Sequence, residues 1–361
     1  MTFDLASLGW DASFAAVYTE FATAQFATAG ADQVPGRVVR VDRGVCTVLT
    51  GAGTVRASFA GAVLAAAGHD PVALPCAGDW VVVRTWPDDR ITAEAVLPRR
   101  SSVVRRTSDK ESTGQVLAAN VDVAAVVEPA DPSPDVGRVE RLLSLAWESG
   151  AQPLVVLTKA DLVADRAAIA AQVAEAAPGV EVLPVSAERG EGVERVRALV
   201  GPGRTLALLG PSGAGKSTLV NALVGAHAMA TQQVRRVDGK GRHTTTYRAL
   251  VPLPDGGAVI DTPGLRAVGL LDGAEGLDRT FADVADLVVA CRFTDCAHRT
   301  EPGCAVRAAL EAGELSHRRW ESWQKLQREL AYEARRKDAR LAAEERARWK
   351  RITKAQRAAR P

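Results

Sequence analysis

The chain has no long apolar run and few cysteines. Its 361 residues are 47% hydrophobic, but no uninterrupted apolar stretch approaches the ~20 residues of a membrane-spanning helix. It has five cysteines and no recognisable secretory signal, so a framework of disulfide bonds is not expected. The length allows two or three domains with their own cores. These observations exclude a membrane-spanning protein and a disulfide-rich secreted domain.

The chain as a whole also lacks a large excess of positive or negative charge, because its formal net charge is only +2. The balance hides an asymmetry between the body and the C-terminal tail. Residues 318–361 contain 15 lysines and arginines against 6 acidic residues, a net charge of +9, which leaves −7 on residues 1–317. A basic tail on an acidic body predicts an anionic partner, and nucleic acid fits best.

A glycine-rich segment fits the phosphate-binding loop of nucleotide hydrolases, Gly-x-x-x-x-Gly-Lys-Ser/Thr. It follows the apolar run 206–209 and precedes the helix-like stretch 217–224. Glycines there let backbone N–H groups converge on phosphate oxygens. Lys216 is expected to reach the outer phosphates and Ser217 to bind Mg²⁺. The predicted nucleotide-binding residues of this loop are Gly210, Pro211, Ser212, Gly213, Ala214, Gly215, Lys216, Ser217 and Thr218.

A second motif predicts which base is bound. Thr158, Lys159, Ala160 and Asp161 follow the apolar run 153–157, at the kind of strand end where open parallel sheets bind ligands. An aspartate there can accept both guanine donors, N1–H and N2–H₂, which adenine does not offer. Ser186 and Ala187, after a second apolar run, fit the loop whose alanine N–H contacts guanine O6. The usual motif begins with asparagine, so the shorter Thr158 predicts weaker bracing of the phosphate loop or of the base.

The order of these two motifs is unusual. In ordinary GTP-binding domains the phosphate loop comes first, whereas here the base-reading motif precedes it by about fifty residues. A strand over 121–127 and helices over 138–148, 165–176 and 192–200 also precede the phosphate loop. The sequence therefore predicts a circularly permuted GTPase domain, which begins at the strand that normally follows the second switch.

The two switch segments follow the phosphate loop in the ordinary order. Residues 240–246 form a polar loop in which Thr245 is expected to bind Mg²⁺ and sense the terminal phosphate. Residues 261–264 form an Asp-x-x-Gly motif after the short strand 258–260. Leu265 stands where many GTPases have the glutamine that orients water, so intrinsic hydrolysis should be slow. His243 is predicted to take that part, an exposed loop histidine being the alternative. The predicted catalytic residues are His243, Lys216, Thr245, Asp261 and Gly264.

Three cysteines and one histidine lie within fourteen residues, as Cys291-x4-Cys296-x-His298-x5-Cys304. This set suits a tetrahedral zinc ion whose role is structural, because four protein ligands leave no position for a substrate.

No glycine or proline occurs between Glu314 and the final residue, which predicts a helix. Its Trp320 and Trp323 are expected to pack on the zinc module, with base stacking as the alternative. Beyond residue 334 a solvated helix that RNA would order is expected.

The region before the GTPase motifs has a different residue pattern, which is typical of short strands. Five short β-rich runs lie between Gly, Pro and Asp turns, at residues 37–41, 45–49, 54–59, 80–85 and 91–96. They fit a small barrel, for which the oligonucleotide-binding (OB) type is the leading candidate, and other five-stranded barrels stay open. Four arginines follow in residues 98–106, either a solvated linker or a stretch that contacts a nucleic-acid backbone. Residues 1–30 have no functional interpretation beyond a weak helical pattern over 14–26.

The barrel, the motif order and the spacing of the four zinc ligands closely resemble the RsgA-type ribosome small-subunit biogenesis GTPases of bacteria, over about residues 31–335. Residues 242–246 and 261–264 resemble that family's switch motifs, whereas Thr158 and the leader before residue 31 depart from its pattern. The resemblance implies a cytoplasmic enzyme that binds the nearly finished small ribosomal subunit and hydrolyses GTP on it. It also implies low intrinsic activity that the small subunit stimulates.

The sequence thus predicts a multidomain α/β protein that binds GTP or GDP, Mg²⁺, one structural Zn²⁺ and ribosomal RNA, and that acts as a monomer. A GTP-dependent regulator of another protein or of a free RNA is the alternative, and a phosphate-loop ATPase or kinase is disfavoured by Asp161. The predicted parts are a leader (1–30), an OB-fold-like barrel (31–97), a basic linker (98–118), the circularly permuted GTPase domain (119–272), a zinc-binding domain (273–335) and a basic helical tail (336–361).

Overall fold

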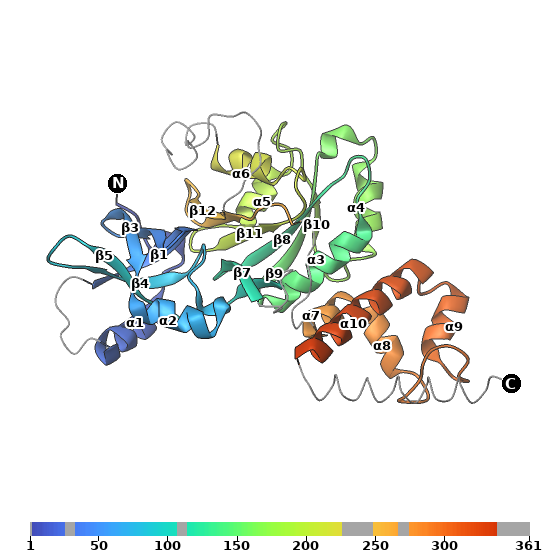
Figure 1. The fold of residues 1–361 in the computed structure, drawn as a ribbon. Helices are drawn as coiled ribbons and strands as arrows, with labels where there is room; N and C mark the ends of the chain where they lie inside the picture. The colour runs from blue at the N-terminus through green and yellow to red at the C-terminus, as the bar shows by residue number, and fades with distance from the viewer. Residues whose placement is uncertain (1, 26–32, 107–113, 226–247, 266–273, 338–361) are drawn as a thin grey trace. The chain divides into compact units, whose positions relative to one another are not determined.

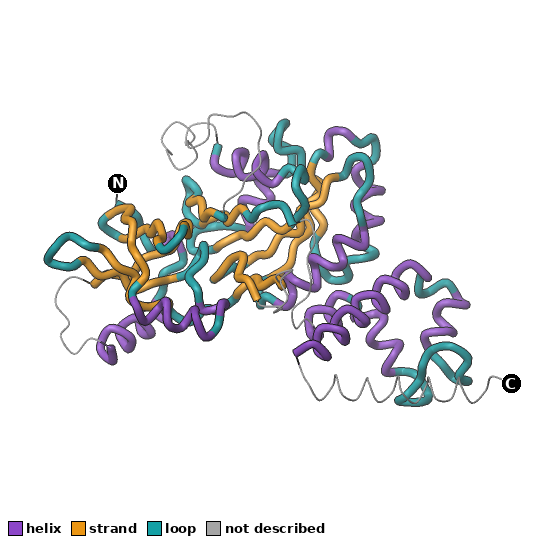
Figure 2. Tube along the Cα trace, viewed as in Figure 1, coloured by secondary structure: helices purple, strands orange, loops and turns teal. Residues whose placement is uncertain are grey.

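The computed structural model describes residues 2–25, 33–106, 114–225, 248–265 and 274–337 (Figure 1). The chain forms two compact units, Met1–Val268 and Gly269–Pro361. The first unit contains all the strands of the described residues, and the second contains only helices and loops there (Figure 2). Among the described residues no helix is both long and apolar enough to cross a membrane.

The first five strands close into a barrel in the order β1-β2-β3-β5-β4. Helix α2 (Gly61–His69) connects β3 to β4, and valines such as Val38, Val48 and Val81 fill the interior. This order and closure confirm the predicted barrel and fit the OB type. The strands are β1 (Gln33–Asp42), β2 (Val45–Thr50), β3 (Gly53–Phe59), β4 (Trp80–Thr85) and β5 (Ile91–Val96).

The first unit also contains a six-stranded sheet in the order β10-β9-β8-β11-β13-β12. Five neighbouring strands run parallel, and only β12 (Ala249–Pro252) is antiparallel to its neighbour. The parallel strands are β8 (Val123–Pro129), β9 (Gln152–Thr158), β10 (Val182–Pro184), β11 (Thr205–Leu209) and β13 (Ala258–Asp261). The helices between them are α3 (Val136–Glu148), α4 (Arg166–Ala174), α5 (Val193–Leu199) and α6 (Lys216–Val224).

The arginine-rich stretch after the barrel is a structured element rather than a solvated linker. Strand β6 (Ser102–Arg106) pairs with β7 (Gly114–Ala119) in an antiparallel ribbon. The Arg99 guanidinium donates to both carboxylate oxygens of Asp79, which is fully buried, at 2.7 and 2.8 Å. Arg99 is therefore engaged inside the fold. The sequence could not reveal this, because its partner lies in the barrel.

Ahead of the barrel, a short 3-10 helix (Ala6–Leu8) leads into helix α1 (Ala12–Gln25). The weak helical pattern of the leader was thus a correct sign of a helix, although it begins two residues earlier than predicted. The side chains of Leu8 and Phe14 are buried, so the leader belongs to the core of the first unit.

A buried arginine joins three helices of the second unit. Arg319 donates to the Asp283 carboxylate at 2.6 and 2.7 Å and to the Thr280 carbonyl at 2.9 Å, with its guanidinium 4.6 Å from the centre of the Phe281 ring. These contacts join the last long helix to the first two. The helices of this unit are α7 (Ala274–Thr280), α8 (Ala282–Val289), α9 (Ala305–Ala312) and α10 (His317–Lys337).

Candidate functional site

Five loops meet at one edge of the six-stranded sheet. Because β8, β9, β10, β11 and β13 run parallel, their carboxyl ends share that edge, which is where open parallel sheets bind ligands. The loop after β11 is the glycine-rich segment, β13 itself ends at Asp261, and the loops after β9 and β10 carry Asp161 and Ser186. The fold thus gathers four motifs that are separated in the sequence.

The phosphate loop has the backbone that its glycines allow. Gly213 and Gly215 have φ values of 81° and 82°, a region that favours glycine. A side chain at Gly210 would lie 2.2 Å from the Val127 carbonyl oxygen, so only glycine fits between β11 and β8. Gly215 precedes the first residue of α6, whose N-terminal N–H groups favour an anion. The loop is therefore built to surround a phosphate.

Lys216 lies across the inside of this loop. Its Nζ donates to the carbonyl oxygens of Gly210 and Pro211, both at 2.8 Å, and the side chain is 6% exposed. Burial lowers the pKa of Lys216, while the nearby Asp261 carboxylate opposes that shift. Phosphate oxygens in the loop would give this ammonium the anionic partner that the two carbonyls only partly replace.

The second switch motif starts beside the phosphate loop. The Ser217 hydroxyl donates to Asp261 Oδ2 at 3.1 Å, so the predicted Mg²⁺ ligand of the phosphate loop contacts the aspartate of the second switch motif. A side chain at Gly264 would lie 2.5 Å from the Ser212 nitrogen, and only glycine allows this approach. The Leu265 N–H donates to the Gly210 carbonyl at 3.0 Å, and its side chain is 3% exposed. An apolar, buried Leu265 cannot orient a water molecule.

Thr158 joins the base-reading loop to the phosphate loop. Its hydroxyl donates to the Ala214 carbonyl at 2.6 Å, across 56 residues of sequence, and the residue is 2% exposed. The sequence predicted weaker bracing at this position, because threonine is shorter than asparagine. The hydroxyl nevertheless reaches the phosphate loop, although β8 lies between β9 and β11 in the sheet. Thr158 therefore retains a brace that its side-chain length alone argued against.

The residues predicted to read the base lie close to one another. A hydrogen bond from the Ser186 hydroxyl is the main cause that lowers the pKa of Asp161, which keeps the carboxylate charged and able to accept two guanine donors. Lys159 has a φ of 56°, and the Ala160 N–H donates to the Val185 carbonyl at 3.2 Å. These backbone contacts hold the loops after β9 and β10 side by side, with Ala187 following Ser186.

One pair of residues at this edge escaped the sequence analysis. Glu128 is fully buried at the end of β8 and accepts from Arg138 Nε at 2.9 Å and from the Asp135 N–H at 3.0 Å. The pair closes the loop between the phosphate loop and the base-reading loop. A glutamate at the end of the apolar run 121–127 was the one sequence signal for it.

Two predicted catalytic residues, His243 and Thr245, lie in residues 226–247, outside the described part of the chain. Lys216, Asp261 and Gly264 are described and lie together at the phosphate loop. Their catalytic roles, like those of His243 and Thr245, stay predictions.

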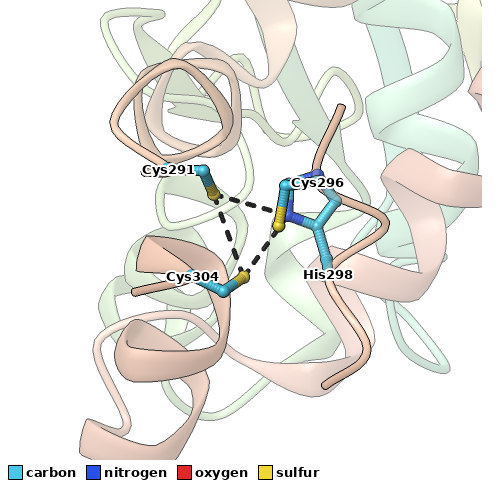
Figure 3. A group of neighbouring side chains, drawn as sticks. All are labelled: Cys291, Cys296, His298 and Cys304. Carbon is cyan, nitrogen blue, oxygen red and sulfur yellow. Dashed lines mark hydrogen bonds between the residues drawn. The ribbon is translucent and has the colours of Figure 1, made fainter. Parts of the chain in front are cut away.

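In the second unit, Cys291, Cys296, His298 and Cys304 form a cluster that could hold a metal ion (Figure 3). Their ligand atoms all lie within 4.8 Å of one another. The sulfur atoms of Cys291 and Cys304 are 3.8 Å apart, and each lies 3.5 Å from His298 Nδ1. A tetrahedral zinc ion, with Zn–S of about 2.3 Å and Zn–N of about 2.0 Å, places two sulfurs about 3.8 Å apart and a sulfur and a nitrogen about 3.5 Å apart. The cluster therefore fits zinc.

The loop that carries His298 is held by groups the sequence analysis did not single out. Glu301 accepts the backbone N–H groups of Arg299, Thr300 and Ala297 at 2.8, 3.0 and 3.1 Å, and these bonds lower its pKa to about 2. The Trp320 ring packs edge-on against the His298 ring at 5.3 Å. Packing on the metal cluster, rather than base stacking, is thus confirmed for Trp320.

Comparisons with known proteins agree with this geometry. Residues 96–271 match the family model described as RsgA GTPase. Two relatives called small ribosomal subunit biogenesis GTPase RsgA are similar over nearly the whole chain. The one from Streptomyces coelicolor is 53% identical, over 96% of this chain and 92% of its own length, and the one from Streptomyces avermitilis is 51% identical, over 96% and 91%.

Two solved structures share the fold. YjeQ from Thermotoga maritima aligns with a TM-score of 0.59 at 25% identity, over 82% of this chain and 98% of its own. YloQ, described as a circularly permuted GTPase, aligns with a TM-score of 0.58 at 23% identity, over 84% of this chain and 96% of its own.

Thr158→Val tests the brace between the two loops. The change removes the hydroxyl and leaves the buried Ala214 carbonyl without its donor. A buried carbonyl without a hydrogen-bond donor destabilises the folded loop by about 1–3 kcal/mol. We expect the affinity for GDP, measured by calorimetric titration, to fall about tenfold or more. Thr158→Ser keeps the hydroxyl and is the control, with near-normal affinity. Equal affinities for the valine variant and the wild type would show that the contact does not support nucleotide binding.

Proposed function

Because the chain belongs to the RsgA GTPase family, we propose that it binds the small ribosomal subunit and hydrolyses GTP there during the subunit's late maturation. The observation that carries this proposal is the sheet edge at which a guanine-reading carboxylate and a phosphate loop meet, joined by the Thr158 hydroxyl. As a GTP hydrolase of this family, the chain uses Mg²⁺ with GTP. We place its work in the cytoplasm, where ribosomal subunits mature.

The chemistry requires little from the protein beyond positioning and charge. As water attacks the terminal phosphorus, negative charge accumulates on the phosphoryl oxygens and the leaving oxygen. Loop N–H groups and the Lys216 ammonium lie where they would stabilise that charge. Ser217 and Asp261 would hold Mg²⁺, which supplies further positive charge there, with Thr245 completing its ligands. The Gly264 N–H would contact the terminal phosphate.

The water-positioning group must come from outside the described site. Leu265 occupies the glutamine position and is buried, so the described residues contain no polar side chain there to orient the water. We assign this part to His243, in the loop that also carries Thr245. A partner that brings His243 to the attacking water would then accelerate hydrolysis, and we expect the small subunit to act in this way.

Three features support ribosomal RNA as the surface the protein contacts. The barrel has the strand order of OB folds, which bind oligonucleotides. Residues 318–361 carry a net charge of +9, which attracts phosphates. The helical unit that carries the metal cluster follows the second switch in the chain, and a change at Asp261–Gly264 would be passed along the chain to it. We propose that barrel, metal module and tail together bind RNA in the GTP state.

Zinc is our assignment for the metal cluster, and its role is structural. The three sulfurs and one nitrogen are the ligand set that zinc prefers, and they leave no open position. Helices α7, α8 and α9 have only 7 to 8 residues each and would be marginal alone. Four protein–metal bonds would hold their ends together.

Co-sedimentation with small ribosomal subunits tests the proposed partner. We expect the chain to bind subunits about 5–150-fold more tightly with a nonhydrolysable GTP analogue than with GDP, the range of an ordinary coupling free energy. Asp161→Asn should lose this response to guanosine nucleotides and regain it with the xanthosine analogue, because the amide can donate to the xanthine oxygen. Absence of binding in either state would favour the alternative, a regulator of a protein or a free RNA.

Turnover of His243→Ala tests the water-positioning group. Single-turnover GTP hydrolysis with saturating subunits should fall about 100-fold, because the attacking water loses its partner. Hydrolysis without subunits should change little, since His243 is proposed to act only when the subunit is bound, and GTP affinity should stay normal. Unchanged stimulated turnover would remove His243 from the mechanism without affecting the assignment of the nucleotide site.

Metal analysis of the purified chain should give one zinc per chain. Cys296→Ser should lose the metal and lower the helical circular dichroism signal, because the folding free energy of small zinc modules comes largely from the metal. Cys46→Ala, in the barrel, is the control and should keep the zinc. A wild-type chain that is folded and free of metal after dialysis against a chelator would contradict the structural role.

A further inference from the structure

The leader ahead of the barrel contacts the GTPase part through its backbone. Residues 4–11 are called the strap below. The Ser7 carbonyl accepts two hydrogen bonds, from the N–H groups of Gly203 at 2.8 Å and Gly257 at 2.7 Å. Gly203 precedes β11, and Gly257 precedes β13. The strap is thereby bonded to the chain just before β11, which leads into the phosphate loop, and just before β13, which ends at Asp261.

The same strap also contacts the barrel and the segment after it. The Leu8 carbonyl accepts from Arg37 Nη1, in β1, at 2.6 Å. The Trp10 ring packs on the Trp80 ring, in β4, with their centres 4.8 Å apart. The Asp11 carboxylate pairs with Arg100 and accepts from its Nη1 at 2.7 Å. Eight residues of the leader thus contact both parts of the first unit.

Arg37 is the point where all three parts meet. From the barrel it reaches the strap at Leu8, and its Nη2 donates to the Asn120 carbonyl and to the Thr205 hydroxyl, both at 3.0 Å. It is 1% exposed, and its guanidinium lies 4.9 Å from the centre of the Trp80 ring. Burial lowers its pKa to about 10, which still leaves it charged at neutral pH.

A buried guanidinium is costly unless its N–H groups are bonded. Arg37 donates to the strap, to Asn120 directly after β7 and to the first residue of β11. If the strap leaves, Nη1 loses its acceptor and the guanidinium becomes open to water on that side. The barrel and the GTPase part are then joined by fewer contacts. Arg37 therefore makes the association of the two parts depend on the strap.

We propose that the strap holds the barrel and the GTPase part in one fixed arrangement, which we call the lock. A displacement of the barrel then also displaces the starts of β11 and β13. The lock itself is a property of this chain alone. Its consequence, that RNA binding at the barrel changes the nucleotide site, rests on the proposed function. Neither the strap nor Arg37 touches the described nucleotide-binding residues, so the lock can be broken without removing them.

Gly9→Ala in the full-length chain breaks the strap's fit with the least change. Gly9 has a φ of 98°, and an added Cβ would lie 2.9 Å from the Gly203 carbonyl oxygen and 3.0 Å from Arg37 Nη1. Gly44→Ala is the matched control, because Gly44 has a φ of 75° with nothing within 4 Å of an added Cβ. Both variants carry the same kind of backbone strain, and only the first disturbs the strap. Deletion of residues 2–11 is the second test variant.

Hydrogen exchange on the GDP complex measures the lock. In Gly9→Ala and in the deletion, amides of residues 36–39 and 203–206 should exchange about tenfold faster or more, the change expected when one charge-assisted hydrogen bond is lost from an opening equilibrium. GDP affinity should stay within about twofold, and Gly44→Ala should exchange like the wild type in these segments. Wild-type exchange rates in both strap variants would overturn the proposal.

The coupling is read separately, as stimulation of GTP hydrolysis by small subunits. A broken lock should reduce stimulation severalfold in Gly9→Ala and leave it intact in Gly44→Ala. Faster exchange with full stimulation would keep the lock and overturn its transmission to the nucleotide site. If the wild type shows no stimulation, the proposed function fails, while the exchange result still decides whether the lock exists.

Discussion

The parallel arrangement of five strands is the constraint on which the rest of the first unit depends. Parallel neighbours end at the same edge, so every loop that follows one of these strands is brought to one place, whatever its order in the chain. That is why a circular permutation leaves the nucleotide site intact: the base-reading loop after β9 precedes the phosphate loop in sequence and still lies beside it. The Thr158–Ala214 hydrogen bond is the direct physical sign of this convergence.

Burial of charge organises the contacts between parts. Arg37 in the barrel, Arg99 after it and Arg319 in the second unit are each largely withdrawn from water, and each is bonded to carbonyls or carboxylates of another element. Such a residue is costly alone and favourable only when its partners are in place. Each of these arginines therefore ties together two elements that have no sequence proximity, and the chain's arginines cannot be read simply as an RNA-binding surface.

The described residues of the site are suited to binding a nucleotide and offer no water-orienting side chain at position 265 for GTP hydrolysis. Phosphate loop, Asp261 and Asp161 meet at one edge of the sheet, whereas Leu265 fills the position of the water-orienting glutamine with a buried apolar side chain. With His243 as the proposed water-positioning group, such a site would hydrolyse GTP slowly until a partner brings the segment that carries it into position. The strap gives such a partner, bound at the barrel, a mechanical connection to the strands that carry the phosphate loop.

Much of this protein was determined by its sequence alone, wherever the signal is local. The five barrel strands, the phosphate loop and the Cys–His spacing each follow from residues close together in the chain, because turns, strand alternation and ligand spacing are short-range properties. Only the tertiary structure decided the brace from Thr158, the pairing of Glu128 with Arg138, the engagement of Arg99 and the role of the leader. These contacts join residues that no periodicity or motif relates, and Arg37 reaches Thr205 across 168 positions. Their energies depend on burial and distance, which exist only once the chain has folded.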